Sequence, residues 1–204
     1  MDILSNTVFA AAAAEHDQTQ SELAALRAQV ASLQSERAAL WWDINHDDLT
    51  GLANRRLLVN VGPTLLNSAR RCAVAVLDLN GFKPINDQYG HAVGDEVLRT
   101  VAGRLSRSVG DDLAVRLSGD EFAAILTETS RPGHGGDWSS RVAAIATAIA
   151  EPMLVDGHEL RVTASIGVAT TNDGPAPIAE LLRRADLAMY RAKADRYCSN
   201  VVWD

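Results

Sequence analysis

Three acidic residues lie where two predicted strands end. Asp78 closes the apolar run CAVAVLDL, and Asp120 and Glu121 lie in the turn of the predicted hairpin RLSGDEFAAIL. A carboxylate in an apolar strand is costly unless it is paired or bound to a metal. If the two strands are neighbours, the three carboxylates meet at one point, where oxygen ligands favour Mg²⁺ or Mn²⁺ bridged to phosphate. Because acidic residues are common in turns, the alternative for Asp120 and Glu121 is that they are solvated turn residues.

The segment 78–98, DLNGFKPINDQYGHAVGDEVL, carries groups suited to a nucleotide. Gly81 lets backbone N–H groups approach phosphate oxygens, and Lys83 supplies a positive charge. Asn86 and Asp95 offer an amide and a carboxylate, which complement the N–H donors and the O6 acceptor on the edge of guanine. The segment therefore favours a site for a guanine nucleotide.

Alternating strands and helices must position these groups. The predicted elements are a helix at 54–70 with a possible break at Gly62-Pro63, strands at 72–79, 113–117, 122–126, 160–169 and 200–203, and helices at 94–108, 139–150 and 178–193. The run 72–79 is apolar throughout, as expected for a central strand covered on both faces. Hairpins and longer crossovers occur together, which predicts an α/β or α+β fold with a mixed central sheet flanked by helices.

Residues 1–45 differ in composition from the rest of the chain, with neither proline nor glycine and many good helix formers. Apolar residues recur there at alternating spacings of three and four, with Arg37 in the one missing place: Leu23, Leu26, Val30, Leu33 and Leu40. This heptad seam predicts a long N-terminal helix that joins two chains as a parallel coiled coil. The alternative is one amphipathic helix folded back on its own domain. We expect two domains, 1–45 and 46–204.

Bulk composition excludes several classes of protein. The chain has 204 residues, a hydrophobic fraction of 47% and a net charge of −7, so it lacks the basic surface expected of a nucleic-acid-binding protein. An apolar run of about 18 residues is missing, so we expect no membrane span. Cys72 and Cys198 lie outside any metal-binding spacing, and we interpret them as reduced thiols of a cytoplasmic protein. The alternative is a disulfide between them.

Five ordered segments together resemble the GGDEF family of diguanylate cyclases over roughly residues 45–204. They are 46–58, 78–98, 116–126, 163–169 and 185–193. The resemblance implies a fold similar to nucleotide cyclases and polymerase palms, and a reaction that joins two GTP molecules into cyclic di-GMP with release of two pyrophosphates. It also implies a homodimer in which each chain holds one GTP, so a coiled coil would raise the concentration of one site near the other. The alternative is a degenerate domain that binds GTP or cyclic di-GMP as a signalling module without turnover.

The resemblance implies metal-binding and catalytic roles at the two strand ends. Asp78 and Asp120, with the backbone carbonyl of Leu79, look like ligands of Mg²⁺ or Mn²⁺. Glu121 looks like a third carboxylate near the attacking 3′-hydroxyl, as ligand or base. The metal ions would neutralise the triphosphate and lower the pKa of the hydroxyl.

The same resemblance implies nucleotide-binding roles on three segments. Asn86 and Asp95 correspond to the family's guanine-reading residues. Phe82, through its backbone N–H, and Lys83 correspond to the phosphate cradle, and Lys193 corresponds to a phosphate-contacting lysine at the last helix.

The sequence departs from the family pattern at several places. The signature turn reads SGDEF at 118–122, and Ser118 would cost on the order of 1–2 kcal/mol if that position needed a left-handed backbone. Arg196 stands one place before the arginine expected near the C-terminus and is our candidate for its phosphate contact. The inhibitory Arg-x-x-Asp site has Val109 in place of arginine and retains Asp112. We therefore expect no product inhibition through that site.

Overall fold

The computed structural model divides the chain into two compact units, Met1–Ile44 and Asn45–Asp204. It describes residues 3–69, 71–128, 138–171, 176–194 and 200–203, with the backbone alone at 3–17 and 200–203.

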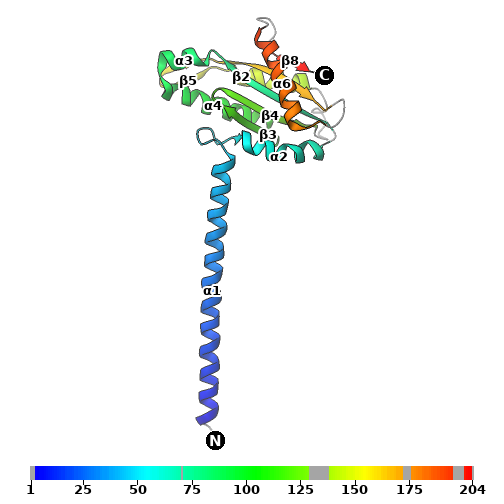
Figure 1. The fold of residues 1–204 in the computed structure, drawn as a ribbon. Coiled ribbons are helices and arrows are strands. Elements are labelled where there is room, and N and C mark those ends of the chain that lie inside the picture. The colour runs from blue at the N-terminus through cyan, green and yellow to red at the C-terminus, as the bar shows by residue number, and fades with distance from the viewer. Residues whose placement is uncertain (1–2, 70, 129–137, 172–175, 195–199, 204) are drawn as a thin grey trace. The chain divides into compact units, whose positions relative to one another are not determined.

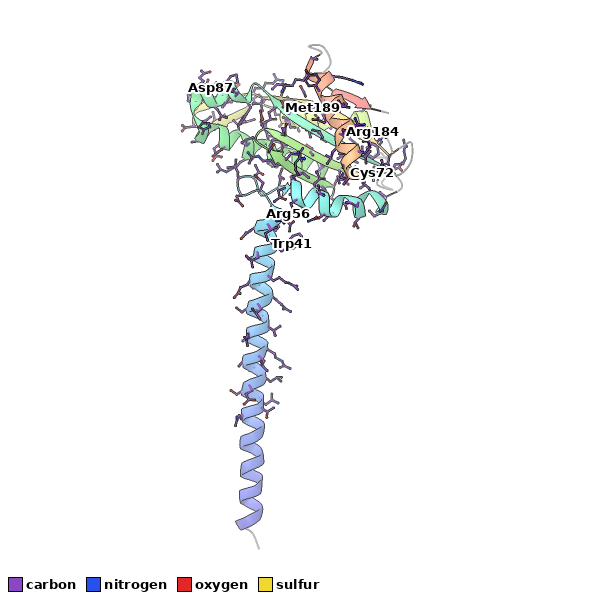
Figure 2. All side chains as sticks on the ribbon, viewed as in Figure 1. Trp41, Arg56, Cys72, Asp87, Arg184 and Met189 are labelled. Atoms are coloured by element: carbon purple, nitrogen blue, oxygen red, sulfur yellow. The ribbon has the colours of Figure 1, made fainter. Side chains whose placement is uncertain are left out.

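The first unit is formed by helix α1 (Ile3–Asn45), which is continuous over its whole length. The five apolar seam residues are each between 39% and 61% exposed in the single chain. Figure 2 shows the described side chains of α1, with Trp41 near the C-terminal end of the helix. None of the helices in the described ranges is long and apolar enough to cross a bilayer. The predicted long N-terminal helix is confirmed, and it presents an exposed apolar stripe.

The second unit is built on a six-stranded sheet with the strand order β1-β3-β4-β2-β7-β8 (Figure 1). Its strands are β1 (Ala53–Asn54), β2 (Cys72–Asn80), β3 (Leu113–Ser118), β4 (Glu121–Thr127), β7 (Thr163–Thr170) and β8 (Asn200–Trp203). The inner pairs are antiparallel, whereas β1 pairs with β3 and β8 pairs with β7 in parallel. The mixed sheet is therefore confirmed, and so is the edge strand at 200–203.

Helices cover both faces of this sheet. They are α2 (Arg55–Ser68), α3 (Phe82–Tyr89), α4 (His91–Val109), α5 (Trp138–Ile149) and α6 (Ile178–Ala194). Alternate residues of β2 face opposite ways: Ala75 and Leu77 pack with α4 and α5, whereas Val74 and Val76 pack with α2 and α6. Because both faces are covered, β2 is apolar at almost every position, as its sequence predicted.

The possible break at Gly62-Pro63 does not occur, and α2 continues through Pro63. Proline removes one backbone hydrogen bond from a helix, so packing must hold the helix together there. Gly62 supplies that packing, because a Cβ built on it would lie 3.0 Å from Cγ1 of Ile178 on α6. Tertiary contact therefore overrides the local signal.

Three other predictions were wrong in detail. The segment before residue 94 contains helix α3, and α4 begins at His91, which places Gly94 inside the helix. The single strand predicted at 160–169 is divided between β6 (His158–Leu160) and β7. β6 forms a hairpin with β5 (Met153–Val155). Strands of three residues are too short to show a period in the sequence.

Candidate active site

The ends of β2 and β4 place two carboxylates side by side. Asp78 and Glu121 are direct partners in the antiparallel pairing, so their side chains leave the same face of the sheet. Strand alternation makes this the face on which α6 packs. The hydrogen bond from the Leu79 N–H to the Asp120 carbonyl, 3.3 Å long, ties the signature turn to the end of β2. The two strands are therefore neighbours, which was the condition under which the sequence placed these carboxylates together.

Helix α6 contributes a cation to this strand end. Nζ of Lys193 lies 2.7 Å from Oδ1 of Asp78, and the aspartate side chain is only 13% exposed. The hydrogen bond to Asp78, together with the charges of Asp78, Asp120 and Glu121, raises the pKa of Lys193 although partial burial opposes this. The ammonium group therefore stays charged and lies in the combined field of three carboxylates.

The signature turn holds the other carboxylate. Oγ of Ser118 donates a hydrogen bond of 3.0 Å to Oε2 of Glu121. Gly119 has a φ of +47°, so the left-handed position of this turn falls on the glycine and not on the serine. The serine at the start of the signature is therefore compatible with the turn.

The strand ends carry oxygen atoms that could bind a divalent cation. Within the ranges that the structure describes, no three acidic, histidine or cysteine side chains gather closely enough to form a ready-made metal site. Asp78 is bonded to Lys193, and Glu121 is bonded to Ser118. The donors are nevertheless hard oxygen atoms of the kind that Mg²⁺ and Mn²⁺ prefer. The Lys193 ammonium also shows that positive charge is stabilised here, so the residues fit such an ion.

A close contact between α3 and α4 positions one predicted guanine reader. A Cβ built on Gly94 would lie 1.9 Å from Oδ1 of Asn86 and 3.3 Å from Cζ of Phe82. The Asn86 amide therefore occupies the space that any larger residue at 94 would fill, and Asp95 follows directly in α4. Sequence reasoning interpreted Gly94 only as a helix-start residue. The sequence signal for its role was the position of Gly94 between Asn86 and Asp95, the two residues predicted to read guanine.

The predicted phosphate cradle lies at the start of α3. Gly81 precedes the helix with a φ of +76°, which glycine adopts without strain. The backbone N–H of Phe82 is thus at the N-terminus of the helix, where the helix dipole favours an anion. The Phe82 side chain is buried in the core, and Lys83 is exposed next to it.

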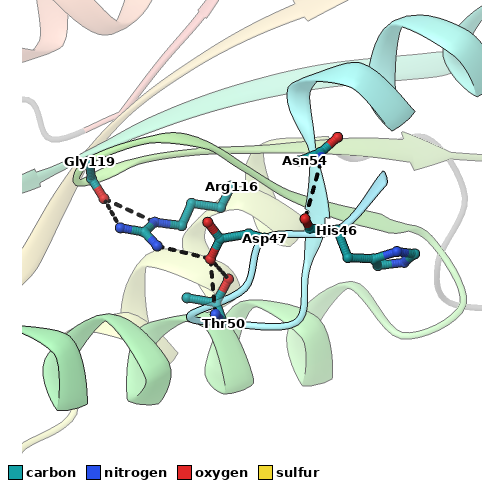
Figure 3. A network of polar contacts seen from close by, with 6 residues as sticks. All are labelled: His46, Asp47, Thr50, Asn54, Arg116 and Gly119. Carbon is teal, nitrogen blue, oxygen red and sulfur yellow. Dashed lines mark hydrogen bonds and ion pairs between the residues drawn. The ribbon is translucent and has the colours of Figure 1, made fainter. Parts of the chain in front are cut away.

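Arg116 supports the signature turn from below, which sequence reasoning missed (Figure 3). Its Nε and Nη2 donate hydrogen bonds of 3.0 and 2.8 Å to the carbonyl of Gly119. Its Nη1 lies 2.8 Å from Oδ1 of Asp47, and the arginine side chain is 11% exposed. The available signal was a basic residue two places before the turn, in a strand that is otherwise apolar.

Asp47 organises the segment 46–54 that leads into the sheet. Its carboxylate accepts hydrogen bonds from the N–H and the hydroxyl of Thr50, at 2.9 and 2.6 Å. Burial raises the pKa of Asp47, but the bonds from Thr50 and Arg116 outweigh this and hold the pKa below its ordinary value. Asn54 caps α2 by accepting from the Leu57 N–H. These hydrogen bonds hold the segment 46–54 against the sheet.

Asp112, the retained residue at the position of the family's inhibitory site, makes hydrogen bonds within the domain. Its Oδ1 accepts hydrogen bonds from the N–H and the hydroxyl of Thr127, and its Oδ2 pairs with Arg141 on α5. Val109, which stands in the place of the family's arginine, is a buried core residue at the end of α4. Arg196, the candidate for a phosphate contact near the C-terminus, lies outside the described residues.

A mixed sheet with helices on both faces, and carboxylates at the ends of its central antiparallel strands, defines a nucleotide-cyclase type of domain. The family described as "Diguanylate cyclase, GGDEF domain" matches residues 44–197. The chain therefore belongs to the GGDEF family.

Named relatives and solved structures agree with this family. The chain is 40% identical over 153 residues to the bifunctional diguanylate cyclase/cyclic di-GMP phosphodiesterase MucR of Pseudomonas aeruginosa, covering 72% of this chain and 22% of MucR. It is 38% identical over 170 residues to the diguanylate cyclase TpbB of the same species, covering 80% of this chain and 38% of TpbB. The coiled coil and GGDEF domain of DgcB from Caulobacter crescentus, solved with c-di-GMP, superposes with a TM-score of 0.77 at 25% identity. That match covers 90% of this chain and 98% of that structure.

Proposed function

We propose that the chain is an active diguanylate cyclase, which condenses two GTP molecules into cyclic di-GMP and releases two pyrophosphates across a homodimer. The observation that carries the proposal is that Asp78 and Glu121 are cross-strand neighbours at the signature turn, where Lys193 forms an ion pair with Asp78. The family match and the diguanylate cyclases among the relatives support it. Because the chain spans 22% and 38% of MucR and TpbB, the activities of those whole proteins are not transferred.

In this proposal the acidic residues at the strand ends would bind the metal ions and activate the 3′-hydroxyl. Asp78, Asp120, Glu121 and the Leu79 carbonyl would hold Mg²⁺ or Mn²⁺, which when bound neutralises triphosphate charge and acidifies the 3′-hydroxyl. Glu121 would also accept the proton of that hydroxyl if it acts as the base. Aligning the hydroxyl of one GTP with the α-phosphorus of another requires two chains.

The remaining groups would bind the nucleotide. Asn86 and Asp95 would read the guanine edge, since an amide and a carboxylate together match its donors and acceptor. The N–H of Phe82 and the charges of Lys83 and Lys193 would bind phosphate oxygens.

Product inhibition through the Arg-x-x-Asp position is not expected in this chain. A guanine base and a phosphate need the guanidinium that Val109 lacks. The Asp112 carboxylate is engaged by Thr127 and Arg141, so recruiting it would break three hydrogen bonds. This arrangement supports a cyclase that is regulated by other means.

The test is conversion of GTP by the full chain with Mg²⁺ or Mn²⁺. We expect Glu121→Gln to lower the rate of cyclic di-GMP formation at least about a hundredfold, because an interaction worth several kcal/mol in the transition state is lost. Glu159→Gln, which changes an exposed carboxylate on β6, serves as the control for charge and should keep the activity. Absence of product from the unmodified chain at high protein concentration would contradict the proposal.

The second candidate is a nucleotide-binding module without turnover. It is favoured by one observation, the hydrogen bond from Ser118 to Glu121, which occupies an oxygen of the proposed catalytic carboxylate. Calorimetry separates the two candidates, because this one predicts binding of GTP or cyclic di-GMP with no product formed.

A further inference from the structure

The ion pair between Lys193 and Asp78 uses an oxygen that the proposed metal site needs. Nζ of the lysine lies 2.7 Å from Oδ1 of the aspartate. Asp78 is the more buried partner, with its side chain 13% exposed, whereas that of Lys193 is 49% exposed. A metal ion bound to the same oxygen would bring two positive charges to one carboxylate, and they would repel each other.

Helix α6 is packed tightly on the sheet, whereas the long Lys193 side chain on it is 49% exposed. A Cβ built on Gly167 of β7 would lie 2.1 Å from the carbonyl oxygen of Ala185 and 2.1 Å from the backbone nitrogen of Met189. The backbone of α6 therefore packs directly on β7, and the adjacent Ala192 is buried. The Cα of Lys193 therefore cannot move far. Its long, partly exposed methylene chain nevertheless lets the ammonium group reach a second partner.

A bound triphosphate would offer such a partner. Nζ of Lys193 lies 2.7 Å from Oδ1 of Asp78, whose direct strand partner is Glu121, so the ammonium group lies at the strand ends where the triphosphate would bind. The oxygens of a nucleotide bound at this site would carry more negative charge than Asp78 alone. An ammonium group that moved to the phosphate would leave Oδ1 of Asp78 available to a metal ion.

We propose that Lys193 exchanges partners, pairing with Asp78 while nucleotide is absent and with the triphosphate once it binds, so that nucleotide binding opens the metal site. This inference rests on the proposed function only in taking a nucleoside triphosphate as the ligand. It assigns Lys193 a second role beyond contact with phosphate. Metal alone binds weakly, and nucleotide and metal each strengthen the binding of the other.

The test is the affinity for Mn²⁺ without nucleotide, measured by electron paramagnetic resonance on the full chain. We expect Lys193→Met to bind Mn²⁺ about three- to tenfold more tightly, because a partly exposed competing charge is removed. Lys193→Arg keeps the charge and should resemble the unmodified chain. Arg183→Met removes the same charge from an exposed position of α6 and should leave the affinity unchanged, which controls for net charge.

The coupling gives a second measurement. A non-hydrolysable GTP analogue should strengthen Mn²⁺ binding to the unmodified chain more than to Lys193→Met, by that same three- to tenfold factor. An Mn²⁺ affinity of Lys193→Met that equals or falls below that of the unmodified chain would overturn the inference, leaving the lysine as a phosphate contact only. Neither measurement involves turnover, so a chain without cyclase activity would still decide the question.

Discussion

The serine that begins the signature turn has an ordinary backbone conformation. Among the residues that the structure describes, Asp156 is the only non-glycine residue with a positive φ. The strain of about 1–2 kcal/mol that a left-handed serine would suffer is therefore absent at Ser118. Its hydroxyl instead adds a hydrogen bond to Glu121.

This conformation predicts the sign of a stability change. Restoring the family residue with Ser118→Gly should lower the free energy of unfolding by about 0.5–1 kcal/mol, because glycine loses more chain entropy on folding. Urea unfolding measures the change, and Ser118→Ala isolates the contribution of the hydroxyl. A stabilisation of about 1 kcal/mol or more would mean that the serine is strained after all.

Gly94 determines where the Asn86 amide lies. Adding a methyl group in Gly94→Ala would displace Oδ1 of Asn86, from which it would otherwise be 1.9 Å away. Alanine favours a helix over glycine by about 1 kcal/mol, so α4 should still form. We predict that affinity for a GTP analogue falls about tenfold or more, as expected when a buried polar contact to the ligand is lost.

Calorimetry on Gly94→Ala, with thermal unfolding alongside, checks this prediction. The matched control is Gly103→Ala in the same helix, where the nearest atom to a new Cβ is Nη1 of Arg107 at 3.5 Å. The control should keep the affinity. Unchanged binding by Gly94→Ala would remove Asn86 from the set of guanine-reading residues.

At the scale of elements, the segment 46–54 and the β3–β4 turn form one hydrogen-bonded assembly. Arg116 connects the Asp47 carboxylate to the Gly119 carbonyl, and β1 pairs with β3 beside it. The geometry of the signature turn therefore depends, through Arg116, on Asp47, which lies 69 positions before that arginine in the chain. A substitution at Asp47 should therefore change both the free energy of unfolding and the geometry of the signature turn.

The lowered pKa of Asp47 makes this contribution depend on pH. A carboxyl group whose pKa is depressed in the folded state stabilises the protein above its ordinary pKa of about 3.9, and the stabilisation is lost as the pH falls through the folded value. Asp47→Asn should lower the free energy of unfolding by about 1–3 kcal/mol at neutral pH, because it weakens charged hydrogen bonds. The difference from the unmodified chain should shrink below about pH 4.

Urea unfolding at neutral pH and at about pH 3 measures both effects. Asp48→Asn is the control, since Asp48 is the exposed neighbour on the same segment. An equal loss of stability in Asp47→Asn at the two pH values would show that the charge of Asp47 is not involved.

At the scale of the whole molecule, α1 carries an apolar stripe that a second copy of the chain would bury. Seam side chains such as Leu26 and Leu33 are 60% and 57% exposed in the single chain. The proposed reaction needs two GTP-loaded chains, and a parallel coiled coil would hold them at high local concentration.

We predict that the double change Leu26→Asp with Leu33→Asp converts a dimer into a monomer. Product formation at nanomolar protein should then fall at least about tenfold and recover as the protein concentration rises, because only the effective concentration has changed. Light scattering and the cyclase assay check this. Ala28→Asp with Ser35→Asp adds the same charge outside the seam and should leave both unchanged; a dimer that survived the seam changes would place the interface elsewhere.

Local periodicity explains what could be predicted from the sequence alone. The apolar run of β2 and the helical spacing of α4 and α6 follow from which of their faces are covered, so the mixed sheet and its helices were predictable. The three-four spacing of α1 predicted the long helix, although its apolar stripe is exposed in the single chain. The ordered motifs around Asp78 and Glu121 also indicated the family. The short strands β5 and β6, helix α3 and the unbroken α2 were missed, because packing and turn geometry decide them rather than a repeating pattern.

Only the tertiary structure determined which residues contact each other at the site. Lys193 meets Asp78 across 115 positions of sequence, and Arg116 meets Asp47 across 69. Such pairs leave no periodic signal, since they arise when strand register and helix docking bring distant backbone segments together. The sequence determined which chemical groups this protein has, whereas the register of β2 with β4 and the docking of α6 determined which of them meet.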